Sequence, residues 1–373
     1  MSTVKANTFQ DASGGSTATI NGMTPTADSL QGFRNRIING DMRIDQRNAG
    51  AAVTANGSYV VDRFLVQNVT DGAFSAQQDT SAPVGFVNSI KWTTTTADGT
   101  LTTTQQASIQ QRIEGTNVSD LAFGTANAKT VTVSFWVRSS LTGTFGGSLR
   151  NGASDRSYPF TYSISVADTW EQKSIAIAGD TSGTWLTTTG VGLVVTWGLG
   201  AGPDRSGTAG AWNSNNNNSA TGAVSVIGTL NATFYITGAQ LEVGSVATPF
   251  ERRPYGTELA LCQRYYYRLA PAATNKPMAL GWAVSTTVGG VVVQFPTTMR
   301  MAPTALEQSG TATDYKINYK ASSASCSSVP IFSTADEQSA GLSFTVASGL
   351  TAGECVGGRS NGTGAYLGFS AEL

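Results

Sequence analysis

Histidine is absent from all 373 residues of this chain, and its absence excludes several kinds of catalytic site. Histidine is the usual general base near neutral pH and the commonest metal-binding side chain. Without it there is no Ser-His-Asp or Cys-His nucleophile, no HExxH zinc helix and no histidine-containing iron site. We therefore expect that the chain is not an enzyme, and its composition favours a structural or adhesive role.

Charged residues are scarce too, at 13% of the chain, about half the usual share. The 23 basic and 24 acidic side chains give a net charge of −1. Such a balance creates no long-range field toward nucleic acid or an anionic membrane. We expect no nucleic-acid partner, and a surface that is polar without being ionic.

Cysteine and long apolar runs are also limited. Cys262, Cys326 and Cys355 form no CxxC pair, which excludes zinc-ribbon and thioredoxin-like sites. Cys326 and Cys355 could form a disulfide, although we expect buried thiols. The apolar stretch from Val191 to Leu199 is too short and too rich in glycine to span a bilayer, and the N-terminus lacks the apolar core of a secretory signal. We expect a soluble chain made in a cytosol, with no membrane insertion, no metal and no cofactor.

What the chain does contain is alternation of apolar and polar residues from Ile37 to about Arg253. In residues 130–138, the apolar side chains would share one face of a strand. The same pattern recurs at residues 162–166, 173–177 and 233–237. Clusters of Gly, Asn and Asp separate these segments and indicate turns. Many short strands joined by turns predict an antiparallel jelly-roll β-sandwich over residues 37–253.

The regions on either side have different patterns. Residues 1–36 hold too few apolar groups for a core, so they form an extended segment that is either disordered or docked onto a partner. Thr257 could cap a helix from Glu258 to Leu269, within a connecting segment 254–269. Its apolar groups lie on more than one face, which favours packing between domains or against symmetry copies. Residues 270–373 return to strand patterns and predict a smaller C-terminal β-domain. The strands expected there are residues 281–284, 290–295, 315–319, 342–346 and 366–369.

Two motifs resemble parts of the jelly-roll carbohydrate-binding modules. Asn39-Gly40-Asp41-Met42-Arg43 is similar to their opening motif, and residues 234–242 are similar to their closing strand. Shorter likenesses occur at residues 135–137 and 169–171. Those modules commonly hold a structural calcium near the two motifs. The resemblance places Arg43 and Gly238 at the corresponding positions, so two oxygen ligands are missing and we expect no calcium there.

A second pattern is carried by six segments, residues 36–48, 59–64, 238–253, 262–266, 295–303 and 371–373. Their order resembles that in bacteriophage tail fibres and related virion adhesion proteins. The resemblance implies a structural protein of the virion tail, assembled in the host cytoplasm as a homotrimer. It implies that residues 1–36 attach to other virion proteins and that residues 270–373 form a distal tip that binds a host-surface glycan or protein.

Two alternatives to a tail fibre stay open. A capsid-decorating head fibre would have the same fold and differ only in the surface to which its N-terminus attaches. A glycan depolymerase would need two carboxylates at a defined spacing, and no local motif nominates such a pair. Asp41 and Asp45 alternate with Arg43 and Arg47, which we interpret as an ion-pair ladder along a strand rather than as a catalytic site.

Aromatic side chains are the candidates for receptor contact, because a ring face packs well against the CH groups of a sugar. Trp136, Trp170 and Trp197 lie in strand patterns and are predicted to be core residues. Trp212 lies in a long loop from Gly198 to Gly222, whose Asn215–Asn218 run we expect to be solvated. The residues nominated for receptor contact are Trp282, Tyr315, Tyr319 and Arg359 in the tip, and Trp212 in the loop. No catalytic, cofactor-binding or metal-binding residue is nominated.

Overall fold

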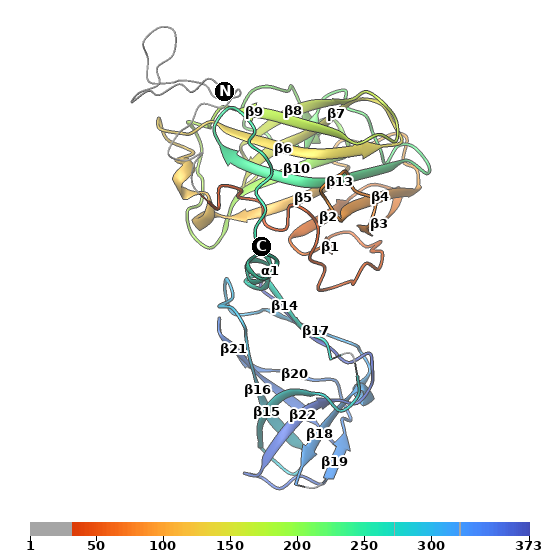
Figure 1. Cartoon of the computed structure of the whole chain (residues 1–373), viewed down its shortest axis with the longest axis vertical. Coiled ribbons are helices and arrows are strands. Elements are labelled where there is room, and N and C mark those ends of the chain that lie inside the picture. Colours follow the sequence, from red (N-terminus) through yellow and green to blue (C-terminus); the bar gives the residue numbers. More distant parts are fainter. Residues whose placement is uncertain (1–31, 272, 321) are drawn as a thin grey trace, which may run out of the picture. The chain divides into compact units, whose positions relative to one another are not determined.

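The computed structural model describes residues 32–271, 273–320 and 322–373 of the chain (Figure 1). The predicted attachment segment 1–36 therefore lies outside the described residues, apart from residues 32–36. The chain divides into two compact units between Arg253 and Pro254. No helix in the described part is long and apolar enough to span a membrane. Both units are built from antiparallel sheets, which confirms the mainly β fold predicted from the alternation.

The first unit is a jelly-roll sandwich of two sheets, with strand orders β1-β2-β5-β10-β7-β8 and β3-β4-β13-β6-β9. The six-stranded sheet comprises β1 (Tyr59–Val61), β2 (Phe64–Asn68), β5 (Gln106–Glu114), β10 (Val191–Ala201), β7 (Gly143–Asn151) and β8 (Ser157–Ile164). The five-stranded sheet comprises β3 (Ala73–Asp79), β4 (Ser89–Thr96), β13 (Thr233–Val243), β6 (Val131–Ser139) and β9 (Glu171–Ile177). Short elements join these strands: η1 (Gly115–Asn117), η2 (Ser119–Leu121), η3 (Pro203–Arg205), β11 (Ser206–Gly207) and β12 (Ser219–Ala220).

Apolar side chains between these two sheets form the core of the first unit. The ring of Phe135 on β6 lies 5.7 Å from that of Trp197 on β10, and Phe145 on β7 lies 6.0 Å from Phe234 on β13. Trp197 is fully buried, as predicted. Trp136 and Trp170 are only half-buried, so the prediction that they are core residues was wrong.

The charged stretch Asp41 to Arg47 is a series of turns and not the strand that we expected. Met42 has a φ of 59°, a left-handed conformation that an extended strand cannot contain. Asp41 pairs with Arg43, while the Asp45 carboxylate accepts the backbone N–H groups of the turn that follows it. The ion-pair ladder is therefore replaced by local turn contacts.

Asn35 joins the N-terminal arm, residues 34–44, to β13. Its Nδ2 donates to the carbonyl oxygen of Ala239 at 3.1 Å, and its Oδ1 accepts the N–H groups of Ile37 and Leu241 at 2.9 and 3.1 Å. Arg253 also donates to the carbonyl oxygens of Asn35 and Ile37. Two of the segments that resemble virion proteins, 36–48 and 238–253, thus contact each other and close the sandwich.

Replacing Asn35 with alanine is expected to lower the free energy of unfolding of the first unit by about 3 kcal/mol. The Asn35 side chain is 4% exposed, and its removal leaves three buried backbone groups without their partners. Thermal or urea unfolding of the full chain measures this change. Asn127→Ala, at an exposed position, is the control and should shift stability by less than about 0.5 kcal/mol. Equal effects of the two variants would contradict the role given to Asn35.

The second unit begins with α1 (Tyr255–Gln263) and contains two sheets, with strand orders β14-β23-β17 and β19-β18-β22-β15-β16-β21-β20. Its first sheet comprises β14 (Tyr266–Leu269), β23 (Leu367–Ser370) and β17 (Ala305–Gln308). The seven-stranded sheet comprises β19 (Ser322–Ser325), β18 (Tyr315–Tyr319), β22 (Cys355–Ser360), β15 (Pro277–Ala283), β16 (Val288–Gln294), β21 (Ser339–Thr345) and β20 (Ile331–Ala335), and η4 (Ala312–Asp314) precedes β18.

The helix is shorter than predicted and begins earlier. It follows Pro254 directly and ends at Gln263, whereas residues 266–269 form β14. Tyr266 pairs with Ser370 of β23, so a partner distant in sequence takes these residues into a sheet. Cys326 and Cys355 are not joined by a disulfide, and Cys355 is exposed rather than buried as expected.

Candidate functional site

The outward face of the six-stranded sheet carries a line of polar side chains. Successive residues of a strand point to opposite faces. On β5, Ala107 and Ile109 are in the core, so Gln106, Gln110 and Arg112 project from the other face. The side of the sheet that does not face the core is therefore rich in hydrogen-bonding groups.

The strand register extends this polar face over β10 and β7. Val194 of β10 pairs with Arg112 of β5 on one side and with Arg150 of β7 on the other. The neighbouring Thr196 pairs in the same way with Gln110 and Ser148. Strands that are far apart in sequence thus bring two arginines and several amide and hydroxyl groups onto one surface.

These side chains line a cleft with a volume of about 340 Å³. Its lining residues are Gln67, Gln106, Gln110, Arg112, Arg150, Gly152, Ser154, Val191, Val194, Arg205 and Asn216. The volume is within the range of small-ligand sites. We call it the polar cleft, and it is the candidate functional site.

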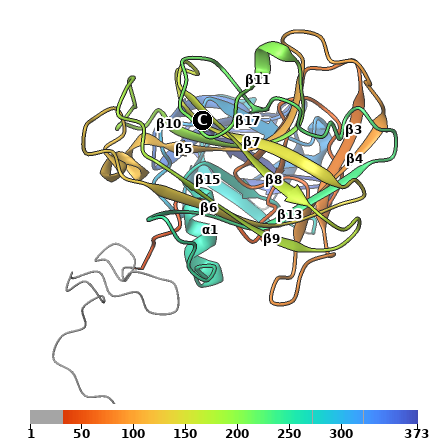
Figure 2. The same ribbon diagram turned by 90° about the horizontal axis from the view of Figure 1, so that it is seen from above.

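One wall of the polar cleft comes from a covering segment, residues 202–222, which lies against the outward face of the sheet (Figure 2). Glycines permit this close approach, since a Cβ at Gly146 would lie 2.3 Å from Ser219 Oγ and one at Gly198 would lie 2.7 Å from Ser219 Cβ. Asn217 and Asn218, which belong to this segment, are buried at 2% and 0% exposure. The expectation that the asparagine run is solvated was therefore wrong for these two residues.

Arg150 is the most unusual side chain in the polar cleft, because it is charged and only 6% exposed. It donates to Asn216 Oδ1 and, at 3.2 Å, to Gln110 Oε1. Burial and, to a lesser extent, the positive charges of Arg112 and Arg205 together lower the pKa of the Arg150 guanidinium to about 10. Asn216 and Gln110 are neutral amides, and no carboxylate lines the cleft.

Several buried polar atoms in and beside the polar cleft have no hydrogen-bond partner among the described residues. They are Gln106 Oε1, Ser108 Oγ, Ser148 Oγ, Arg150 Nε, Thr196 Oγ1 and both side-chain polar atoms of Asn218. The set contains donors, acceptors and hydroxyl groups that can act as either. Buried polar groups are normally paired, so this arrangement suits a ligand rich in hydroxyl groups.

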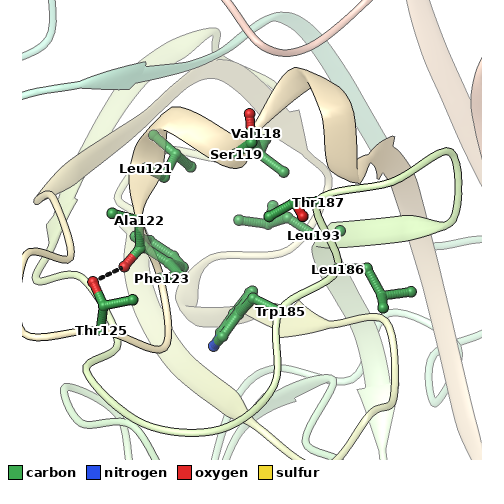
Figure 3. A pocket seen from close by; sticks show the side chains of 11 residues that line it. Val118, Ser119, Leu121, Ala122, Phe123, Thr125, Trp185, Leu186, Thr187 and Leu193 are labelled. Atoms are coloured by element: carbon green, nitrogen blue, oxygen red, sulfur yellow. Dashed lines mark hydrogen bonds between the residues drawn. The ribbon is translucent and has the colours of Figure 1, made fainter.

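A second pocket, with a volume of about 250 Å³, is apolar (Figure 3). Its labelled lining residues are Val118, Ser119, Leu121, Ala122, Phe123, Thr125, Trp185, Leu186, Thr187 and Leu193. The Thr125 hydroxyl donates to the carbonyl oxygen of Ala122 at 2.7 Å, and Ser119 donates to that of Thr116 at 3.4 Å. Because these hydroxyls already bind the backbone, this pocket is less suited to a sugar than the polar cleft.

Trp212, which was nominated for receptor contact, is half-buried, and its ring packs against other aromatic side chains of the first unit. Its ring lies 5.4 Å from Trp185 and 5.8 Å from Phe123 in edge-on contacts. Its indole N–H donates to the carbonyl oxygen of Ala178 at 2.7 Å. The indole N–H of Trp212 thus already has a hydrogen-bond partner within the first unit.

The four residues nominated in the second unit do not form one surface. Trp282 is 55% exposed, and it shares the outward face of the seven-stranded sheet with Arg359. Tyr315 is fully buried, and its hydroxyl donates to the carbonyl oxygen of Tyr366 at 2.7 Å. Tyr319 packs against the core cluster of this unit. The nomination of Tyr315 for receptor contact was therefore wrong, and only Trp282 and Arg359 lie on the same outward face.

The residues of the polar cleft were missed by the sequence analysis. Gln106, Gln110 and Arg112 alternate with core residues, but such a pattern describes any strand with one solvated face. Arg150 follows a glycine-rich stretch that resembles turns. Only the pairing of β5, β10 and β7 brings them together.

Arg43 and Gly238 stand at the positions that correspond to calcium ligands in the carbohydrate-binding modules. Arg43 pairs with Asp41, and Gly238 adopts a φ of 60°. Among the residues that the structure describes, no group of three or more Cys, Asp or Glu side chains could hold a metal.

No protein-family model and no curated protein matches this chain. Among solved structures, the enzymatically active domain of bacteriophage CBA120 tailspike protein 4 is 10% identical with a TM-score of 0.30, and the match covers 57% of this chain and 22% of that one. A Bacteroides thetaiotaomicron protein described as sugar-binding is 12% identical with a TM-score of 0.33, over 56% of this chain and 100% of that one. A family 11 carbohydrate-binding module from Clostridium thermocellum, solved with a β-1,3-1,4-mixed-linked tetrasaccharide, is 11% identical with a TM-score of 0.26, over 54% and 100% of the two chains. The chain thus spans about a fifth of the tailspike domain. These are likenesses of fold, and they assign no function to this chain.

Proposed function

We propose that this chain is a virion adhesion protein whose jelly-roll unit binds a host-surface glycan in the polar cleft. The observation that carries this proposal is the cleft itself, in which buried donors and acceptors without protein partners lie on a rigid sheet. Sites built on strands hold side chains more precisely than sites on mobile loops. A ligand with many hydroxyl groups can satisfy such groups, and each hydrogen bond then contributes to affinity.

Binding is the activity that this cleft favours over hydrolysis. Glycosidases commonly use a pair of carboxylates at the scissile bond. The residues that line the polar cleft are amides, hydroxyls, arginines and apolar groups, without a carboxylate. We therefore do not propose a depolymerase at this site.

The virion part of the proposal rests on the resemblance of the six sequence segments to tail fibre and related adhesion proteins. In this proposal residues 1–36 attach the chain to other virion proteins of the tail, and three copies assemble. Multiple copies would raise the avidity of a weak glycan site. A head fibre is the alternative, and it differs in the particle surface that residues 1–36 would fit.

The second unit offers another candidate surface for receptor contact. Trp282 and Leu280 are 55% and 72% exposed on β15, and Val292 of β16, which pairs with Leu280, is 36% exposed. An exposed aromatic ring among apolar neighbours could contact a host glycan or protein. This surface has fewer hydrogen-bonding groups than the polar cleft, so we place the main glycan site in the jelly roll and not, as the sequence resemblance implied, in the tip.

Replacing Gln106 with alanine is expected to weaken glycan binding by the full-length chain about tenfold. Gln106 is 7% exposed and lines the cleft, and its Oε1 lacks a partner among the described residues. One lost hydrogen bond accounts for a change of this size. The measurement is the affinity of each variant for the oligosaccharide that the wild-type chain binds best on a glycan array.

Trp282→Ala is the matched control for the Gln106 variant, because it alters the second candidate surface and leaves the cleft unchanged. We expect its affinity to equal that of the wild type. If Trp282→Ala loses binding while Gln106→Ala retains it, the glycan site lies in the second unit and our placement is wrong.

A further inference from the structure

The positive charges in the polar cleft indicate the charge of its ligand, whereas the hydrogen-bonding groups indicate only that the ligand is polar. Three guanidinium groups, those of Arg112, Arg150 and Arg205, line one cleft of about 340 Å³. Three like charges in a small volume repel one another, which is a cost unless an opposite charge is present. The three guanidinium groups therefore favour a negatively charged ligand over a neutral or positively charged one.

Arg150 shows this cost most clearly. Its side chain is 6% exposed, it has no ion pair with a described residue, and its Nε lacks a hydrogen-bond partner among them. Its pKa is lowered by burial and by the charges of Arg112 and Arg205. A buried charge is normally paired with an opposite charge, whereas Arg150 donates to two neutral amides.

Arg205 is the second cation of the cleft that a ligand could reach. It is half-buried, it precedes β11 in the covering segment, and its Nε donates to the carbonyl oxygen of Thr104 at 3.4 Å. No ion pair joins it to a described residue. It therefore keeps donors available for a group in the cleft.

The acidic side chains of this region lie outside the cleft. Glu114, the next outward residue of β5, is fully buried, whereas Asp204 and Asp155 are exposed. None of the three is a lining residue. Among the described residues, no carboxylate that lines the cleft balances the charges of Arg150 and Arg205.

We propose that the ligand is an acidic glycan, a polyhydroxylated sugar that carries an oxyanion, and that Arg150 and Arg205 bind this oxyanion. The inference rests on the proposed glycan-binding function and narrows its ligand class. A guanidinium presents two parallel N–H groups that match the oxygens of a carboxylate or a phosphate. The amide and hydroxyl groups along β5 and β10 would bind the ring hydroxyls, so charge and polyhydroxyl character are recognised together.

The test is an array of paired glycans probed with the full-length chain. Each uronic-acid oligosaccharide is printed beside its methyl ester, and each phosphorylated oligosaccharide beside its dephosphorylated form. We expect the anionic member of a pair to bind at least about tenfold more tightly, with a preference that declines as salt rises. The two series of pairs distinguish a carboxylate from a phosphate.

Arg205→Gln and Lys173→Gln are the matched variants, because each removes one positive charge from the first unit. Lys173 lies on β9 of the opposite sheet, paired with Glu171 at 2.6 Å. We expect Arg205→Gln to abolish the preference for the anionic member and Lys173→Gln to keep it. Thermal melting of both variants checks that they are folded.

The outcomes separate this inference from the proposed function. Equal binding to the charged and neutral members of the pairs, or an unchanged preference in Arg205→Gln, would overturn the acidic-glycan inference and leave glycan binding standing. Absence of binding to every glycan by the wild-type chain would overturn the proposed function, and the inference with it.

Discussion

Replacing Arg150 with methionine is expected to abolish binding of the acidic glycan and to raise the melting temperature of the first unit. We expect both effects to have one cause, since the buried charge that we propose binds the ligand also destabilises the unliganded fold. The pKa of Arg150 in the folded chain is lowered to about 10, and this lowering corresponds to roughly 3 kcal/mol.

The sign of the pH dependence follows from the same values. The folded chain holds the Arg150 proton less tightly than the unfolded chain, so the charged side chain lowers stability at every pH below about 10. That penalty declines as pH rises above about 10. At neutral pH it is fully present, and removing the charge therefore stabilises the fold.

Methionine has an unbranched side chain similar in length to the stem of arginine and carries no charge. Loss of the hydrogen bonds to Asn216 and Gln110 offsets part of the gain, at about 1 kcal/mol each. We expect a net gain of about 1 kcal/mol, or a rise in melting temperature of about 2–4 °C. Calorimetry and glycan titration of the full chain measure both effects. A variant that loses stability would show that Arg150 supports the fold.

Replacing Gly146 with valine is expected to displace the covering segment and disrupt the polar cleft. A Cβ at this position would lie 2.3 Å from Ser219 Oγ and 2.7 Å from the Ala220 backbone nitrogen, so β12 must move. Residue 216, which contacts Arg150, is part of the same segment. We expect a loss of about 1–3 kcal/mol in stability and at least about tenfold weaker glycan binding.

Limited proteolysis of the Gly146→Val variant is expected to cleave within residues 208–218 at an increased rate, because the displaced segment becomes accessible. Gly99→Ala is the control, since a Cβ there has no neighbour closer than 4.0 Å. If Gly146→Val and Gly99→Ala are cleaved at the same rate, the covering segment does not depend on the close contact at Gly146.

The core of the jelly roll could be predicted from local alternation, whereas its ligand site could not. Val131, Val133 and Phe135 are all fully buried, as their spacing indicated. The strand β7 was not predicted, because its Gly146 and Gly147 resemble a turn. Tertiary packing requires both glycines. A Cβ at position 146 would clash with Ser219, and one at position 147 would clash with Phe160.

The helix and Trp212 also differ from the sequence-based predictions because of contacts with residues far away in the sequence. Residues 266–269 continue the apolar pattern of the helix, yet they pair with β23, which lies about a hundred residues further along the chain. Trp212 lies in a long loop, a position that suggested exposure, but it packs against Phe123 and Trp185. Long-range partners of this kind leave no local signal in a single sequence.

The motifs that carry the family resemblance have structural roles where the structure describes them. Arg253 holds the N-terminal arm by donating to the carbonyl oxygen of Ile37, and Asn39 binds backbone groups at Ile44 and Asp62. Such contacts specify the fold and not the ligand. The polar cleft lies on the outward face of the other sheet, a face whose side chains do not form the core.

The most direct test of the account is a crystal structure of the full-length chain with the acidic oligosaccharide that it binds best. We predict that the sugar occupies the polar cleft, with its oxyanion within hydrogen-bonding distance of Arg150 or Arg205 and its hydroxyls close to Gln106 and Gln110. A sugar bound against Trp282, with none in the polar cleft, would contradict the central claim.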